Sequence, residues 1–406
     1  MKIFYGWRIA AAGAGLSFLH SALFLQAFGA YVAVLSQERG WGKTALAGGA
    51  ALQSVEGALL GPALGWLVDR FGPRILVRAG IVLWALGFAA LSQIESIAGF
   101  YGAVLLMALG TTFSGYFPLS VTLVHWFQRW RTRALSLMSL GLAAGGIALP
   151  LVGWFMQTYG WRNTAIASAV LVLVFGWPLA STLRRTPGEM GEKIDGQTPV
   201  AGAPARKSTL PPAGRDFTAL EAIRTRAFWF LGLGHGFALL VVTSVNVHAL
   251  SHIKEGLGYS LAEAAVVITV MTMAQTVGIL VGAAVGDQWN KRYVSSACML
   301  AHMFGLLALT YANHLWMLAA FAILHGGAWG LRGPIMQAMR ADYFGLQAIG
   351  MILGLSAILV AIGQVAGPLL AGYFADLTGN YRVGFTILAA TAGSGSVLFM
   401  LAKRPA

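Results

Sequence analysis

Long apolar stretches alternate with short polar connections along nearly the whole chain. Each stretch holds about 20 residues or more, the length that an α-helix needs to cross the hydrocarbon core of a bilayer. The pattern therefore predicts an all-α polytopic membrane protein with twelve transmembrane helices. They cover residues 9–35, 45–68, 75–93, 98–127, 134–157, 163–183, 227–252, 261–286, 293–311, 315–340, 346–373 and 383–402.

One long polar segment, residues 184–226, interrupts this alternation. It is rich in proline, glycine and charges of both signs. Such a composition cannot bury a core, so we interpret it as a flexible cytoplasmic linker. It divides the chain into an N-terminal six-helix bundle, residues 1–183, and a C-terminal six-helix bundle, residues 227–406.

The two halves repeat each other at an offset of 216 to 218 residues. Pro118 corresponds to Pro334, and Pro150 corresponds to Pro368. Parallel six-helix repeats are an architecture of secondary transporters, with the substrate site near the bilayer midplane between the halves. The repeat therefore predicts two pseudo-symmetric bundles around a central site.

Composition supports a membrane protein: 57% of residues are hydrophobic and 10% are charged, against about 25% charged in soluble domains. The single cysteine, Cys298, excludes an intramolecular disulfide and a paired-cysteine metal or redox motif. The sequence also lacks a phosphate-binding loop and the common hydrolase motifs. We therefore expect neither an enzyme nor a cofactor, and no spacing of histidines predicts a metal site.

The net charge of +13 suggests nucleic-acid binding until its placement along the chain is considered. With both termini in the cytoplasm, 21 of the 27 lysines and arginines fall on the inner side, as the positive-inside rule requires. Five fall on the outer side: Arg39, Lys43, Arg162, Lys254 and Arg382. We therefore predict a multi-pass protein of the cell inner membrane, in contact with the lipid bilayer and without a nucleic-acid partner.

The first inner loop carries a recognisable motif, because residues 65–74 read Gly-Trp-Leu-Val-Asp-Arg-Phe-Gly-Pro-Arg. This resembles the signature of the major facilitator superfamily, in which the cluster is taken to latch the outward-open state. A related but weaker motif follows the eighth span. The resemblance implies a conformational latch formed by Gly65, Asp69, Arg70, Gly72, Arg74, Asp287 and Arg292.

Three shorter motifs narrow the resemblance. They are Tyr-Gly-Trp-Arg at 5–8, Trp-Phe-Gln-Arg-Trp-Arg at 126–131 and Tyr-Gly-Trp-Arg at 159–162. They look like the monocarboxylate-porter and oxalate/formate-antiporter branch, which implies transport of small organic anions by proton symport or anion exchange. The sequence departs from this branch at Ile279, where the branch often has an arginine that binds substrate.

The permanent positive charge of Arg332 lies inside an apolar run from about 315 to 339. Placing an arginine at this depth costs at least ~2.5–3.5 kcal/mol, so such a residue normally faces a partner or a watery cavity. The surrounding glycines and Pro334 allow close backbone approach and free a carbonyl group. We expect Arg332 to bind an anionic substrate; the alternative is a side chain that reaches the cytoplasmic headgroups.

Four other polar or aromatic residues are candidates for the same site: Tyr116, His248, Gln275 and Trp329. Tyr116 corresponds to Arg332 in the repeat, so we expect both to project into one central cavity. Each has a structural alternative, as a residue packed between helices or at the membrane interface.

Glu56 is a carboxylate deep in the second span, and a buried carboxylate near a cation is a workable proton carrier. Glu56 and His248 are therefore the proton-coupling candidates, with a structural ion pair as the alternative for Glu56. We interpret the remaining histidines as packing or interface residues: His20, His125, His235, His302, His314 and His325.

Together these features predict a monomeric transporter that moves a small organic anion by alternating access, coupled to a proton or a counter-anion. Two alternatives stay open. One is a multidrug or metabolite exporter of the same fold, and the other is a membrane sensor that does not transport.

Overall fold

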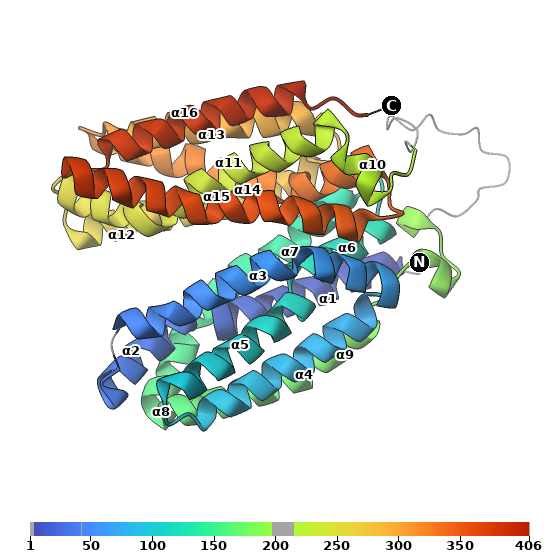
Figure 1. Cartoon of the computed structure of the whole chain (residues 1–406), viewed down its shortest axis with the longest axis horizontal. Helices are drawn as coiled ribbons and strands as arrows, with labels where there is room; N and C mark the ends of the chain where they lie inside the picture. Colours follow the sequence, from blue (N-terminus) through green and yellow to red (C-terminus); the bar gives the residue numbers. More distant parts are fainter. Residues whose placement is uncertain (1–3, 42, 197–214, 406) are drawn as a thin grey trace. The chain divides into compact units, whose positions relative to one another are not determined.

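The computed structural model describes residues 4–41, 43–196 and 215–405, and these residues form helices and connecting turns without a β-strand. The chain divides into two compact units, Met1–Leu210 and Pro211–Ala406 (Figure 1). Each unit is a bundle of long helices joined by short turns. The all-helical fold class predicted from the apolar pattern is confirmed.

The described residues of the first unit form nine α-helices, several of which continue into one another through short 3-10 or π-helical segments. They are α1 (Tyr5–His20), α2 (Phe28–Arg39), α3 (Lys43–Phe71), α4 (Pro73–Ser92), α5 (Ile97–Ser114), α6 (Tyr116–Trp126), α7 (Arg131–Gly145), α8 (Leu149–Leu171) and α9 (Trp177–Thr182). A π-helical turn, Ser21–Leu25, lies between α1 and α2. The first predicted span is therefore α1, this turn and α2 together.

Two glycines break helices that the apolar pattern shows as continuous. Gly115 has an extended conformation between α5 and α6, so the fourth span consists of two helices. Gly160 has φ 82° and ψ 159°, a conformation that residues with a side chain rarely adopt, and it interrupts α8. The break at Gly160 separates the fifth predicted span from the sixth.

In the second unit, the part of the chain that the structure describes forms seven α-helices and one further π-helical turn, His252–Gly256. The helices are α10 (Ala219–Ile223), α11 (Arg226–Ser251), α12 (Leu261–Val285), α13 (Lys291–Thr310), α14 (Leu315–Phe344), α15 (Ile349–Thr378) and α16 (Arg382–Leu401). Pro334 and Pro368 lie inside α14 and α15, the two longest helices of this unit.

Within the described residues, nine helical segments are long and apolar enough to cross a membrane. One of them, Arg131–Thr182, is 52 residues long and is divided by the break at Gly160. The helices α3 and α14 lie outside these nine segments, but with 29 and 30 residues they are long enough to cross a bilayer. The prediction of twelve transmembrane helices agrees with this arrangement.

Loops that should lie on the same side of the membrane meet at one end of the first unit. Glu95, between α4 and α5, pairs with Arg39 at the end of α2 at 2.8 Å and with Arg162 of α8 at 2.6 Å. Trp161 also donates a hydrogen bond to Glu38 across 2.7 Å. Because these contacts join the connections after the first, third and fifth spans, they place those three connections together.

The flanks of the central segment are folded, which corrects the prediction of a flexible linker over 184–226. On the first flank, Asp195 accepts hydrogen bonds from the main-chain N–H groups of residues 128–130, and Glu192 accepts one from Tyr5 N. On the second flank, Phe217 is buried and its N–H donates to Phe344 O at 3.0 Å. Residues 197–214 lie outside the described part of the chain.

Candidate functional site

Arg332 lies in the middle of α14 and is 1% exposed. Its Nε and Nη1 atoms have no hydrogen-bond partner in the described structure, although a guanidinium carries five N–H donors. The side chain is on the side of α14 that faces α13, where Cys298 is within electrostatic range. This burial favours a side chain enclosed by protein over one that reaches the headgroups.

The surroundings of Arg332 are positively charged or neutral. Arg340, about two turns further along α14, is also buried, and its Nη2 lies 3.2 Å from His235 Nδ1 of α11. Two further imidazoles, His302 of α13 and His325 of α14, are fully buried nearby. Among the buried residues described in the second unit, none is a carboxylate. A buried charge without a counter-charge is costly, so this interior favours an anion.

The glycines around Arg332 position α14 directly against α12. A Cβ atom at Gly330 would overlap the carbonyl oxygen of Gln275, and one at Gly326 would overlap that of Met271. On the opposite helix, a Cβ atom at Gly278 would overlap the carbonyl oxygen of Gly327. The two backbones are therefore in direct contact over more than a helical turn, which fixes the position of Arg332 relative to α12.

The other predicted substrate residues have more ordinary environments. His248 lies 3.0 Å from the carbonyl oxygen of Pro368 through Nε2, which donates this hydrogen bond, and its ring is 5.1 Å from that of Tyr381. This contact ties α11 to α15. Gln275 and Trp329 are both half-buried, and the main chain of Gln275 forms part of the α12–α14 contact.

Tyr116 begins α6, directly after the break at Gly115, and is half-buried in the first unit. The chain changes direction at this break, and the aromatic residue that starts α6 is two positions beyond the end of α5. The expected convergence of Tyr116 and Arg332 on one cavity stays a prediction, because the two residues belong to different units.

Glu56 is the only carboxylate among the buried residues that the structure describes, at 7% exposed. Its Oε2 accepts a hydrogen bond from Thr112 of α5 at 3.0 Å, whereas its Oε1 has no partner. Glu56 therefore has one oxygen fixed and one oxygen available for a proton or a cation. The described contacts show a hydrogen bond to α5 in place of the structural ion pair considered from the sequence.

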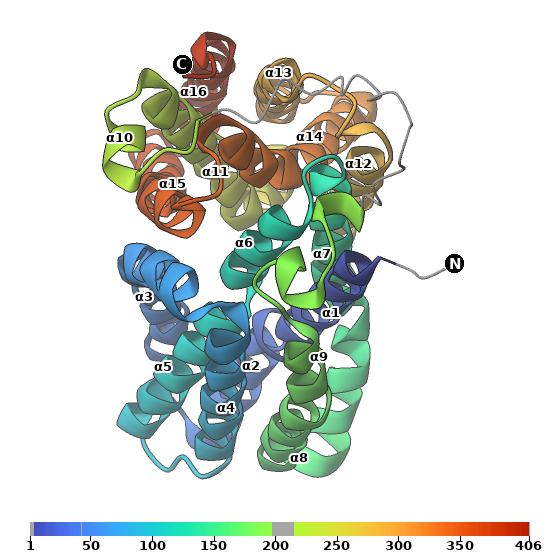
Figure 2. The ribbon, with the colours of Figure 1, turned by 90° about the vertical axis from the view of Figure 1, so that its right-hand side faces the viewer.

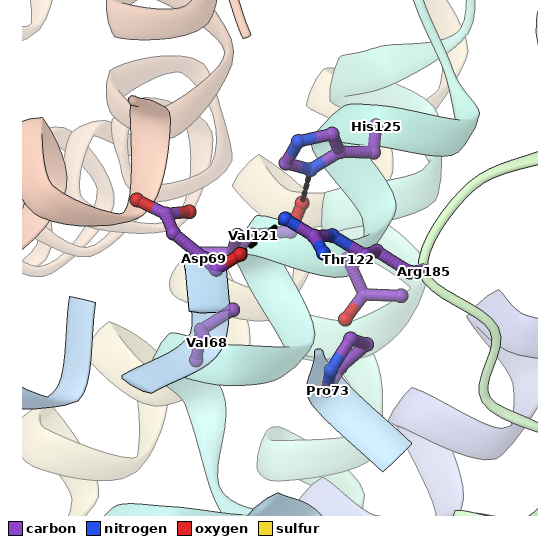
Figure 3. A pocket seen from close by; sticks show the side chains of 7 residues that line it. All are labelled: Val68, Asp69, Pro73, Val121, Thr122, His125 and Arg185. Atoms are coloured by element: carbon purple, nitrogen blue, oxygen red, sulfur yellow. Dashed lines mark hydrogen bonds between the residues drawn. The ribbon is translucent and has the colours of Figure 1, made fainter. Parts of the chain in front are cut away.

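The inner-loop motif forms a small pocket with residues from α6 and from the central segment (Figure 3). Arg185 donates a hydrogen bond to the main-chain oxygen of Asp69, while the Asp69 carboxylate points away from this guanidinium. His125 lies on the other side of the pocket, with Nδ1 2.8 Å from Val121 O. Arg185 and His125 are members of this cluster that the motif itself does not reveal.

The remaining motif residues have structural contacts of their own. Gly65 is buried in α3, Arg70 packs over the Trp66 ring at 5.2 Å, and Gly72 has φ 80° where the chain turns into α4. The Arg74 Nε is buried without a partner. A glycine at position 72 is therefore required by the turn, independently of any latch.

In the second unit, an ion pair next to the corresponding loop involves residues that the motif does not include. Lys291 Nζ lies 3.0 Å from Asp342 Oδ2 and joins α13 to the end of α14. Arg292 packs over Tyr293 at 5.1 Å, and Asp287 is half-buried at the start of the turn. Lys291 and Asp342 were missed because their partnership depends on helix packing, which the sequence of the loop does not show.

The sequence also gave no sign that His302 and His325 form a pair. Their Nδ1 atoms lie 3.1 Å apart, and both Nε2 atoms are buried without a partner. Both residues were interpreted as packing histidines. Among the described residues, no group of three or more His, Cys, Asp or Glu side chains is placed to hold a metal ion.

Comparison with known proteins agrees with this architecture. A family model described as Major Facilitator Superfamily matches residues 14–249 and 231–406. Monocarboxylate transporter 13 of Bos taurus is 26% identical over 82% of this chain and 74% of its own length. Monocarboxylate transporter 11 of Homo sapiens is 28% identical over 98% of this chain and 82% of its own length.

Two solved structures show the same fold. The human organic anion transporter MFSD10 (TETRAN) has a TM-score of 0.71 and 16% identity, covering 97% of this chain and 99% of its own. The proton:xylose symporter XylE has a TM-score of 0.75 and 14% identity, covering 99% and 96%. With the family match spanning both units, the chain belongs to the Major Facilitator Superfamily of multi-pass membrane transporters and is not an enzyme.

Proposed function

We propose that the protein transports small organic anions of the monocarboxylate type and that Arg332 binds the carboxylate. The observation that carries the proposal is the buried guanidinium with two unpartnered nitrogen atoms, in an interior without a described buried carboxylate. A carboxylate can accept two parallel hydrogen bonds from a guanidinium, a strong and directional contact. The relatives named monocarboxylate transporters support this substrate class.

Anion binding at Arg332 gives a physical reason why substrate binding should be coupled to the movement of the two bundles. A bare arginine charge in the membrane interior opposes any rearrangement that leaves it desolvated, and a bound carboxylate neutralises it. Alternating access then follows as movement of one bundle against the other around the occupied site. Tyr116, Gln275 and Trp329 are the residues that we assign to the rest of the substrate contact, and His248 to its edge.

The inner-loop residues Gly65, Asp69, Arg70, Gly72 and Arg74, with Asp287 and Arg292, are assigned to the conformational latch. The contact between Arg185 and Asp69 adds the central segment to this cluster. We place the protein in the cell inner membrane as a monomer with both termini in the cytoplasm. The meeting of Arg39, Glu95 and Arg162 at one end of the first unit supports the alternation of loops behind this topology.

The test is thermal unfolding of the detergent-purified protein against a panel of mono- and dicarboxylates. One class of carboxylate should raise the Tm of the wild type and leave Arg332→Gln unchanged. Arg382→Gln is the matched control, because Arg382 is an exposed arginine at the start of α16 and should keep the response. Equal stabilisation of wild type and Arg332→Gln would refute the assignment of Arg332.

A second candidate is export of an organic cation by the same fold, and Glu56 is the observation that favours it. Its unpartnered Oε1 is a suitable acceptor for a buried cation. If lipophilic amines raise the Tm of the wild type but not of Glu56→Gln, and carboxylates have no effect on either, the cation exporter replaces the anion transporter. Under the anion proposal, Glu56→Gln keeps its stabilisation by carboxylates.

A further inference from the structure

The pair formed by His302 and His325 has an incomplete set of hydrogen bonds. The residues lie on antiparallel neighbours, α13 and α14, with their Nδ1 atoms 3.1 Å apart and both side chains fully buried. One Nδ1 must carry the hydrogen of this bond and the other must accept it. A neutral imidazole whose Nδ1 is protonated has a bare Nε2, so one of the two buried Nε2 atoms is a free acceptor.

The same two helices place Arg332 close to this pair. His325 and Arg332 are seven residues apart, which is about two helical turns and therefore the same face of α14. On α13, His302 is one turn from Cys298, the residue that faces Arg332. The pair and the guanidinium are therefore parts of one buried row between α13 and α14.

The charged and titratable groups on the surrounding helices make this row sensitive to an anion. These groups are Arg332 and Arg340 of α14, Cys298 of α13 and His235 of α11. The described acidic residues of α12, α14 and α15 lie near the ends of their helices. A proton added to the pair is therefore repelled by the guanidinium charge of Arg332. An anion bound to Arg332 compensates this positive charge, which favours the protonated pair.

We propose that His302 and His325 form the proton-binding site of the transport cycle and that they take up one proton when an anion binds Arg332. This rests on the proposed function. The proton adds to the bare Nε2 of the imidazole that donates through Nδ1, giving an imidazolium whose Nδ1–H bond to the second histidine becomes charge-assisted. Anion and proton then each strengthen the binding of the other, as thermodynamic linkage requires.

The experiment measures proton uptake on binding, by titration calorimetry of L-lactate and of pyruvate in buffers of different ionisation enthalpy. Wild type should take up about one proton per bound anion. The double variant His302→Gln/His325→Gln should bind the anion with less than about a fifth of this uptake. His314→Gln changes an exposed histidine in the turn before α14 and should match wild type.

The outcomes separate this proposal from the proposed function. If neither probe nor any other small carboxylate of the panel gives binding heat with wild type, the anion transporter and the proton site both fall. Anion binding without proton uptake, or unchanged proton uptake in the double variant, would refute the assignment of the proton to the histidine pair and leave the anion transporter standing. Loss of uptake in Glu56→Gln would assign the proton to the first unit instead.

A measurement on wild type covers the case in which the double variant does not fold. The apparent Kd for the anion should fall by up to about tenfold for each unit by which the pH is lowered, because one proton is bound with each anion. Nitrogen-15 spectra of the imidazoles should show one bare Nε2 that becomes protonated on addition of the anion. A Kd independent of pH, or an Nε2 unchanged by the anion, overturns the proposal.

Discussion

The carboxylate of Asp195 accepts a 2.8 Å hydrogen bond from the main-chain N–H of Arg129, although the two residues are 66 positions apart. The same carboxylate accepts from Gln128 and Trp130, so it satisfies three N–H groups in the turn before α7. Asp195 itself has φ 60°, a left-handed conformation that aspartate and asparagine tolerate better than most residues. A residue of the central segment therefore satisfies the free N–H groups of this turn at the end of the first bundle.

Replacement of Asp195 should destabilise the first unit through loss of these hydrogen bonds. Asp195→Gly keeps the left-handed backbone and removes the acceptor, so it should cost about 0.5–2 kcal/mol, the range for loss of a helix cap. Asp195→Asn keeps one acceptor and the backbone preference, and should cost less. Thermal unfolding and limited proteolysis of 184–196 measure the effect; equal behaviour of the two variants would contradict the role of the hydrogen bonds.

A methyl group at Gly330 should separate α12 from α14. Gly330→Ala would overlap the carbonyl oxygen of Gln275, and overpacking of this kind costs about 1–3 kcal/mol. Gly333→Ala is the matched control on the same helix, because a Cβ atom there meets nothing within 4 Å. The control should unfold at or above the wild-type Tm, since alanine is the better helix former. A lower Tm for both variants would indicate a general intolerance of this helix.

The ion pairs of Glu95 should make stability depend on acidity. The hydrogen bond from Arg39 holds the pKa of Glu95 below its usual range, with a further contribution from Arg162. A depressed carboxylate pKa gives stability that is present above about pH 4.3 and is lost as the pH falls through the lower folded value. Glu95→Gln should therefore lower the Tm slightly at pH 7, and this difference should shrink as the pH falls below about 4.3.

Salt is the control for this prediction, because exposed ion pairs are screened at high ionic strength. The difference in Tm between wild type and Glu95→Gln should shrink in 1 M salt at pH 7. A difference that does not shrink at low pH or in high salt would show that the substitution acts through packing instead.

The fold could be predicted because membrane spans are selected by length and apolarity, and both are local properties of the sequence. The breaks at Gly115 and Gly160 could not, since many glycines in apolar runs stay helical and only the backbone conformation distinguishes these two. The folded flanks of the central segment were missed for another reason. Their stability comes from single long-range contacts, such as Phe217 with Phe344, and average composition does not record such contacts.

The candidate site was predictable only in part. Arg332 was identifiable because a permanent charge within an apolar run is rare, and the structure buries it without a hydrogen-bond partner at Nε and Nη1. His302 and His325 carry no such signal, because a histidine is neutral or charged according to its neighbours. Their proximity arises from the antiparallel packing of α13 and α14, which places residues 23 positions apart within 3.1 Å.

The central segment forms side-chain hydrogen bonds to the equivalent turn of each repeat. Asp195 binds the turn before α7, and Asp216 accepts a 2.8 Å hydrogen bond from Leu346 N in the turn before α15, the corresponding position of the second half. The two anchors, Asp195 and Asp216, are 21 positions apart in the sequence. Both ends of the central segment are therefore hydrogen-bonded to equivalent turns of the two halves.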